Sequence, residues 1–176
     1  MIERFKDLKE VQMIVFQLGN EEYAVPITSV QEIIMPLIPT RIPKSPSFVE
    51  GVINLRGHII PIIDGRKKFQ LNSESQSKES RIMVLDIEHE VIGLIVDAVC
   101  EVVHLKTEDI EPAPVDMMDE SDFLWGVGKF KNRLLILLNP QRFLSQNEAI
   151  DLKRITQIAD NIKLANDELI VESSTK

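Results

Sequence analysis

Two stretches of this sequence occur twice, in the same order and without gaps. Residues 13–34 align with residues 82–103 at a constant offset of 69, and residues 48–64 align with residues 123–139 at an offset of 75. Alternating apolar residues alone can make two strand-rich segments look alike. Two ungapped blocks in one order are harder to obtain that way, so the repeat predicts two similar β subdomains in tandem. The identical pairs are Val15/Val84, Glu21/Glu90, Val30/Val99, Glu32/Glu101, Phe48/Phe123, Gly51/Gly126 and Val52/Val127.

Each block has the pattern of a β-hairpin. Short apolar runs rich in β-branched residues flank Gly19-Asn20 and Arg56-Gly57, and the second copy repeats both arrangements. Gly57 aligns with Asn132, and both residue types tolerate the positive φ of a tight turn. The repeat therefore keeps turn chemistry as well as hydrophobicity. The runs expected to form strands are 13–18, 22–27, 30–35, 51–55 and 58–63, then 82–87, 91–96, 99–105, 126–130 and 134–138.

These strands predict an all-β fold of two tandem five-stranded barrels that share a hydrophobic core, with short terminal helices. Sheets this small cannot bury both faces alone, so each is expected to shield the other. The expected domain spans 12–144, with approximate subdomains 12–70 and 81–144 and a polar link at 71–80.

Helical segments are expected only at the two ends of the chain. Residues 2–9 could form one or two turns, and 145–176 are expected to form a helical extension with a frayed end. Ser145 and Asn147 are candidate caps of this extension. Its apolar stripe could dock on its own domain or bind a partner. The stripe consists of Leu152, Ile155, Ala159, Ile162 and Leu169.

Composition excludes several functional classes. The formal charge of −8 and pI of about 5.0 disfavour nucleic acid as a partner. Cys100 is the only cysteine, so a Cys-rich metal site is excluded and a buried, inert thiol is expected. The amino terminus lacks an apolar signal region and the longest apolar runs are too short to span a bilayer, so we expect a soluble cytoplasmic chain without direct membrane insertion.

No motif points to catalysis, a cofactor or a metal. His58, His89 and His104 are not spaced as metal ligands. The sequence contains no phosphate-binding glycine loop and no nucleophile elbow. An acidic cluster does not match a calcium loop, and we interpret it as a solvated loop. Its members are Asp116, Asp119, Glu120 and Asp122.

Charged residues inside apolar strands are the unusual feature. Glu32 lies within VQEII, Glu101 takes the same place in VCEVV, and Asp97 ends VIGLIVD. Arg56 lies at a hairpin tip where the second copy has Lys131. Such charges either face solvent on an edge strand or are paired. A second interpretation is a polar rim around an apolar groove that receives another protein.

The run EGVINLRGHIIPIID at 50–64 resembles the CheW family of chemotaxis coupling proteins, which have a hairpin of this kind followed by a proline-containing strand that ends in aspartate. The resemblance extends over roughly residues 12–144. Its other motifs are LGNEEYAVPITSVQEI, GLIVDAVCEVV, IEPAP and RLLILLN. One departure is Gly65, because family members usually have leucine between Asp64 and Arg66.

The resemblance implies two SH3-like barrels and a non-catalytic adaptor that bridges the cytoplasmic tips of methyl-accepting chemoreceptors to the regulatory domain of the histidine kinase CheA. It also implies a place in receptor arrays at the inner face of the membrane. The family hairpin matches Asn54, Leu55, Arg56 and Gly57, where Arg56 would make polar contacts and Gly57 would set the turn. The receptor-facing groove would use Ile27, Val30, Glu32, Ile33 and Val96.

Other roles remain open on sequence grounds. The chain could be a detached regulatory domain of a CheA-like kinase, although it contains no ATP-binding or phospho-accepting histidine region. The residues after the core are too few for a phosphorylatable receiver. A small-molecule-binding double barrel or an uncharacterised hydrolase would need a deep pocket with convergent polar groups, and the scattered histidines give little support for one.

Overall fold

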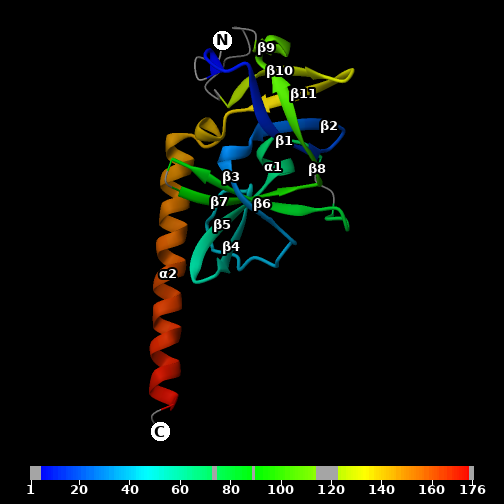
Figure 1. Cartoon of the computed structure of the whole chain (residues 1–176). Helices are drawn as coiled ribbons and strands as arrows, with labels where there is room; N and C mark the ends of the chain where they lie inside the picture. Colours follow the sequence, from blue (N-terminus) through cyan, green and yellow to red (C-terminus); the bar gives the residue numbers. More distant parts are fainter. Residues whose placement is uncertain (1–4, 73–74, 89, 114–122, 175–176) are drawn as a thin grey trace.

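The computed structural model of the chain describes residues 5–72, 75–88, 90–113 and 123–174, with the side chains of the last helix described as far as Lys163. Two twisted sheets are stacked on each other (Figure 1). The predicted two-barrel, all-β fold is confirmed, and the first barrel has the short β9 as an additional strand. The first barrel has the order β8(Ala98–Lys106), β1(Glu10–Leu18), β2(Glu21–Pro26), β11(Arg133–Leu138), β10(Leu124–Phe130), β9(Ile110–Pro112). The second has the order β3(Val30–Ile34), β6(Arg81–Ile87), β7(Glu90–Val96), β5(His58–Asp64), β4(Val49–Leu55).

The barrels do not follow the two halves of the sequence. Strands β1 and β2 of the first copy pair with β8 and β11 of the second copy, and β6 and β7 of the second copy pair with β3 and β5 of the first. The expected subdomains 12–70 and 81–144 therefore do not form one barrel each. The physical reason is that the connections after β2 and β7 are very short and carry the chain directly to the other sheet. The segment 71–80 joins α1(Gly65–Lys68) to β6, so it links two parts of the second barrel.

The duplication is visible in this exchanged topology. Replacing each strand by its counterpart in the other copy converts the order β3-β6-β7-β5-β4 into β8-β1-β2-β11-β10. The irregularities repeat as well: β4 has a register shift between Val49 and Gly51, and β10 has one between Leu124 and Gly126. Both shifts lie at the same positions of the repeat, which supports a true internal duplication.

The largest cluster of buried side chains lies between the barrels. Along β1, Met13 and Val15 point into the first barrel, while Ile14, Phe16 and Leu18 join the shared cluster. Strand β6 alternates in the same way, with Val84 inside the second barrel and Leu85 in the shared cluster. These strands bury both faces, as expected for small sheets that shield each other.

The short helix α1 begins where the sequence departs from the family pattern. The Asp64 side chain caps it by accepting a hydrogen bond from Lys67 N at 3.1 Å. A Cβ atom at Gly65 would lie 2.7 Å from the Ile95 carbonyl oxygen and 2.9 Å from Leu18 Cδ2. Glycine therefore permits a close approach here, and the helical turn forms despite its low propensity.

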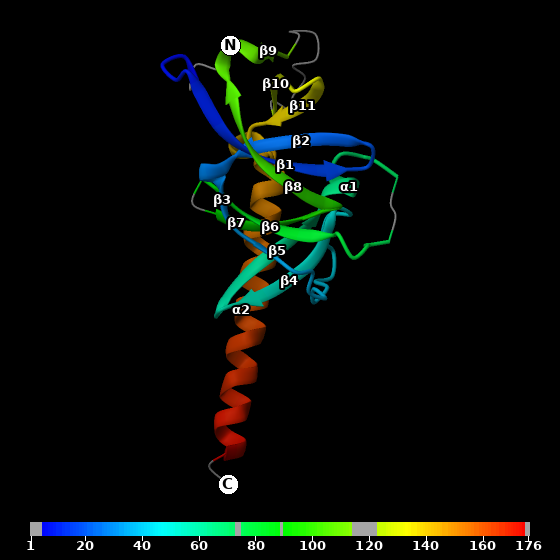
Figure 2. The same cartoon turned by 45° about the vertical axis from the view of Figure 1, so that its right-hand side comes forward.

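The carboxy-terminal helix α2(Gln146–Ser174) is longer than expected. It begins one residue after the predicted cap Ser145, whose Oγ accepts from Glu148 N at 3.2 Å, while Asn147 lies within the helix. The stripe residues Leu152, Ile155 and Ala159 join the shared core, so this part docks on its own domain. The helix then extends beyond the barrels (Figures 1 and 2). At the other end, residues 1–4 lie outside the described part, and one turn closes with Leu8 N donating to Phe5 O.

The docking of α2 gives a stability prediction. Leu152 is 1% exposed, and replacing it with alanine should lower the free energy of unfolding by about 2–4 kcal/mol. Ile162 is 51% exposed on the same helix, so Ile162→Ala should change the free energy by less than about 0.5 kcal/mol. Urea unfolding followed by circular dichroism measures both. Equal effects of the two substitutions would contradict the observed docking.

Candidate protein-interaction site

The β4–β5 hairpin presents the residues that match the family motif. Arg56 and Gly57 both have positive φ, at 50° and 89°, so they form the kind of two-residue turn that joins antiparallel strands tightly. Asn54 Oδ1 accepts a hydrogen bond from Gly57 N at 2.9 Å. Leu55 packs against the interior of the second barrel. Asn54, Leu55 and Gly57 thus fix the turn, and Arg56 is left at its tip.

Arg56 forms a two-point ion pair with Glu32 of β3. The distances are 2.6 Å from Nη1 to Oε1 and 2.8 Å from Nη2 to Oε2. The hydrogen bond from Arg56 holds the pKa of Glu32 below its usual range, and the same contact raises the pKa of Arg56. The Arg56 side chain is 71% exposed, so it can meet a partner while Glu32 keeps it in place.

The pairing predicts the titration of Glu32. Its pKa is lowered in the folded chain, so the ion pair favours the folded state above the carboxyl's unfolded pKa and is lost as the pH falls through the folded value. Replacing Arg56 by alanine should move the pKa of Glu32 back towards the usual glutamate range. Side-chain carboxyl NMR across acidic pH measures this. An unchanged Glu32 titration would show that the pair does not persist in solution.

A groove of about 760 Å³ opens beside this ion pair, between the second barrel and α2. Its floor includes Leu55, Ile60 and Leu152, while Arg56 and Glu32 lie on its rim. Lys153 of α2 also lines it and forms an ion pair with Glu90 at 3.0 Å. Opposite charges around an apolar floor are typical of a surface that receives another protein. The interpretation of Glu32 and Arg56 as rim charges therefore fits this groove.

Helix α2 is a part of this surface that sequence reasoning did not identify. Lys163 Nζ donates to the Gly57 carbonyl oxygen at 3.1 Å, which places α2 directly against the hairpin tip. A second groove of about 620 Å³ lies between α2 and the β3–β4 connection, with Ile38 and Ile162 exposed along it. The apolar stripe of α2 signalled docking, but the stripe does not say onto which face the helix docks.

The other predicted site residues differ in how far their side chains are exposed. Ile27 and Val30 are half-buried and pack against the shared core, and Ile33 is exposed on β3. Val96 is 0% exposed and belongs to the shared core. The expectation that Val96 lines an open groove is therefore corrected, because its side chain fills the space between the barrels. It can support a surface only from beneath.

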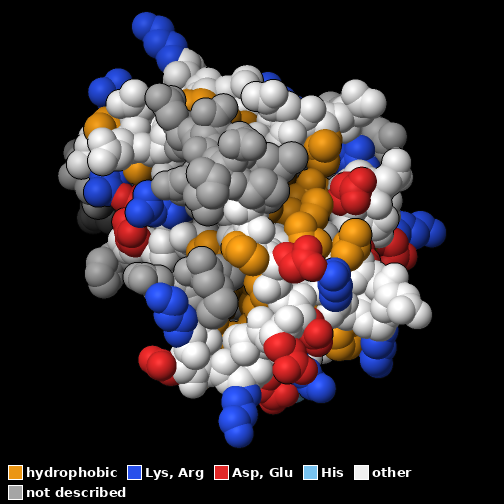
Figure 3. Space-filling view, turned by 90° about the horizontal axis from the view of Figure 1, so that it is seen from above, with side chains coloured by type: hydrophobic (Ala, Val, Ile, Leu, Met, Phe, Trp, Pro, Cys, Tyr) orange, Lys and Arg blue, Asp and Glu red, His pale blue; other side chains and the backbone are white. Residues whose placement is uncertain are grey.

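The charged residues singled out in the sequence, Glu32, Arg56, Asp97 and Glu101, are all ion-paired. Glu101, the counterpart of Glu32, pairs with Arg133 of β11, and Asp97 pairs with Arg66 of α1. The first barrel also exposes the apolar side chains of Val102 and Leu134. Seen from the first-barrel end, apolar side chains are interspersed with charged ones (Figure 3). Pairing with a residue of another element, rather than simple solvation, explains these charges.

The remaining candidate groups form no reactive site among the residues described. No cluster of three His, Cys, Asp or Glu side chains in this part could hold a metal ion. His89 and the acidic cluster at 116–122 lie outside the described residues. Cys100 is exposed rather than buried, because β8 is an edge strand. Partial desolvation is the main cause that raises the pKa of its thiol, and the negative charge of Glu22 is the second. In the ranges that the structure describes, no helix combines the length and apolar character needed to cross a bilayer.

Comparison with known proteins gives one consistent family. The family model for the CheW-like domain matches residues 12–148. A chemotaxis protein CheW from Helicobacter pylori is 38% identical over 143 residues, which is 81% of this chain and 87% of the relative. A Klebsiella aerogenes protein of the same name is 41% identical over 138 residues, or 78% and 83% of the two chains. The crystal structure of the scaffolding protein TtCheW from Thermoanaerobacter tengcongensis superposes with a TM-score of 0.73 at 37% identity and covers 79% of this chain and 95% of that one.

Proposed function

The chain belongs to the CheW family of chemotaxis proteins, and from this membership we propose that it is a non-catalytic adaptor that couples chemoreceptor tips to the histidine kinase CheA. The observation that carries the proposal is the family hairpin, whose exposed Arg56 is held by Glu32 at the rim of an apolar groove. An apolar floor with charged edges suits a helix-in-groove contact, in which the charges set the register. Modest contacts of this kind gain strength when they repeat in an array at the inner face of the membrane.

Two alternatives receive less support. The relatives named above are CheW proteins that the chain covers over most of their length, including 95% of the solved scaffolding protein, and this favours an adaptor over a detached kinase domain. For small-molecule binding, the groove would need polar groups directed at a ligand. Four of its charged side chains are instead paired with each other as Arg56–Glu32 and Lys153–Glu90.

The proposed contact residues differ in the roles that their positions suit. Arg56 and Glu32 would supply the polar contacts, and Ile33 would supply exposed apolar surface. Ile27 and Val30 would contribute the edges that remain exposed next to the shared core. Asn54, Leu55 and Gly57 would act through the turn that they stabilise.

A reconstitution separates the adaptor from its alternatives. The purified chain is mixed with a receptor cytoplasmic fragment, with the kinase, or with both, and the complexes are recovered through a tag on this chain. Recovery of all three proteins together, with kinase activity that depends on the receptor fragment, supports the adaptor. Recovery of neither partner overturns it.

A further inference from the structure

The chain crosses between the two barrels at two equivalent places. After β2 it crosses through Ile27–Ser29, and after β7 it crosses through Asp97 alone. These crossings are counterparts in the repeat, in which Asp97 corresponds to Thr28. Hydrogen bonds and ion pairs that Asp97 makes therefore act where the two sheets join.

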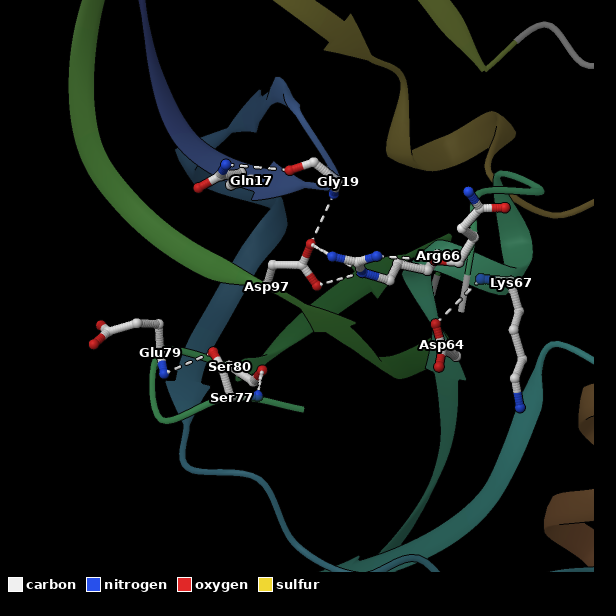
Figure 4. Close-up of polar contacts among 10 residues, drawn as sticks. Gln17, Gly19, Asp64, Arg66, Lys67, Ser77, Glu79, Ser80 and Asp97 are labelled. Atoms are coloured by element: carbon white, nitrogen blue, oxygen red, sulfur yellow. Dashed lines mark hydrogen bonds and ion pairs between the residues drawn. The ribbon is translucent and has the colours of Figure 1, made fainter. Parts of the chain in front are cut away.

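Asp97 connects both barrels through its carboxylate. Its Oδ2 accepts from Gly19 N at 2.7 Å, in the β1–β2 turn of the first barrel. Arg66 lies on the helix that follows β5 of the second barrel, and it donates from Nε to Asp97 Oδ1 at 2.8 Å and from Nη2 to Oδ2 at 2.6 Å. Arg66 Nη1 also donates to the Asn72 carbonyl oxygen at 2.8 Å. Figure 4 shows Gly19 and Arg66 meeting at this one carboxylate.

The Asp97 network is shielded from solvent more than the Arg56–Glu32 pair. The side chains of Arg66 and Asp97 are 15% and 26% exposed, whereas that of Arg56 is 71% exposed. The Asp97 backbone N also donates to Gln17 O at 2.9 Å, so its main chain is held as well as its carboxylate. Charge-assisted hydrogen bonds in such a setting are roughly twice as strong as neutral ones.

The equivalent place at the other crossing is fastened differently. The counterparts of Gly19 and Arg66 are Glu88 and Gln141. Here Glu88 N donates directly to Gln141 Oε1 at 2.7 Å. Among the residues that the structure describes, a neutral amide hydrogen bond thus stands where the first site has a two-point ion pair and a bound turn. Asp97 contacts the turn before β2 and Ile27–Ser29 follow β2, so the two crossings lie at opposite ends of that strand and are fastened by different contacts.

We propose that Arg66, Asp97 and Gly19 form a clamp that fixes the orientation of the two barrels. The barrels then move relative to each other at the opposite end of their interface, where the chain crosses through Ile27–Ser29. Asp97 is then a positioning residue for the candidate interaction site, because Ile27 and Val30 lie at the crossing that is held less strongly. The effect on signalling rests on the proposed function, whereas the orientation of the barrels is a property of the chain alone.

Distances between spin labels test the clamp without any partner. In a Cys100→Ser background, Lys106→Cys labels β8 of the first barrel and Arg41→Cys labels the connection bridged to β4 of the second. Double electron–electron resonance should give a narrow distance distribution. Asp97→Ala should broaden it, and Asp97→Asn, which keeps an acceptor for Gly19 N, should broaden it less. An unchanged distribution in a folded Asp97→Ala protein overturns the proposal.

Matched controls keep the measurement specific. Glu111→Ala removes the exposed ion pair to Lys129 within the first barrel and should leave the distribution unchanged. Gln141→Ala removes the neutral bond at the other end and should broaden the distribution less than Asp97→Ala does. If Asp97→Ala fails to fold, Asp97→Asn and Arg66→Lys carry the test, and an unchanged distribution in both overturns the clamp.

A coupling assay then tests the positioning role. Asp97→Ala should lose most receptor-dependent kinase activation, and Asp97→Asn, whose distance distribution broadens less, should lose less. A merely structural role would not make the loss of activation follow the width of the distance distribution. If the unmodified chain binds neither partner, the proposed function fails, while the spin-label result for the clamp remains valid.

Discussion

Replacing Arg56 by alanine is expected to return receptor-dependent kinase activity to its receptor-free level while the protein stays folded. The Arg56 side chain is 71% exposed, so the lost ion pair should have little effect on stability. At an interface, losing a charged group that also anchors its neighbour should weaken receptor binding by about tenfold or more. Titration calorimetry with a receptor cytoplasmic fragment and a coupled kinase assay measure the two effects.

The repeat supplies a matched control for this substitution. Lys131 occupies the same turn position in the second copy, with φ of 46° against 50° for Arg56. Lys131→Ala should leave receptor binding unchanged. Arg56→Lys keeps the charge but loses the two-point geometry, so it should fall between the native protein and Arg56→Ala. Normal coupling by Arg56→Ala would show that the hairpin tip is not part of the interaction site.

Val30→Asp is a harsher test of the same surface. Val30 packs against the shared core, so an aspartate there would place a carboxylate against apolar side chains. We expect it to abolish coupling and to lower stability as well. Arg56→Ala is therefore the cleaner of the two substitutions.

The hairpins were predictable from sequence because their signals are local. Turn residues such as Gly57 and Asn132 are adjacent to the strands that they connect, and both adopt positive φ as expected. The exchange of strands between barrels was not predictable. It depends on the parallel pairing of β2 with β11 and of β5 with β7, contacts between segments far apart in the sequence. A duplicated sequence is equally compatible with exchanged and separate barrels.

The hairpin motif of the candidate site was predictable from sequence, whereas the residues and elements that lie around the hairpin were less so. The placement of Val96 shows the limit, since an alternating strand does not reveal whether its second face meets solvent or another sheet. Glu32 and Arg56 are separated by 24 residues, so their pairing followed from the fold rather than from spacing. The position of α2 beside the hairpin likewise depends on tertiary packing.

Gly51→Ala is expected to lower the free energy of unfolding by about 2–4 kcal/mol. Gly51 has φ of 141°, and an added Cβ would lie 2.2 Å from the Thr40 carbonyl oxygen. That oxygen cannot move freely, because it accepts from Val52 N at 2.9 Å while Thr40 N donates to Val52 O at 2.8 Å. The clash therefore meets fixed backbone at the bulge of β4, where the Thr40 bridge closes the edge of the second barrel.

Two further glycines make the Gly51 prediction specific. A Cβ at Gly126, the counterpart of Gly51, would lie 2.1 Å from the Glu111 carbonyl oxygen, so Gly126→Ala should be destabilising to a similar degree. A Cβ added at Gly57 would have no neighbouring atom within 4 Å, and Gly57→Ala should cost only the roughly 1–2 kcal/mol of a left-handed backbone. Chemical denaturation of the three variants ranks them. If Gly51→Ala were as mild as Gly57→Ala, the contact with Thr40 would not be the reason for glycine at this bulge. Losses of similar size at Gly51 and Gly126 would show that each barrel depends on its own copy of the same close backbone contact.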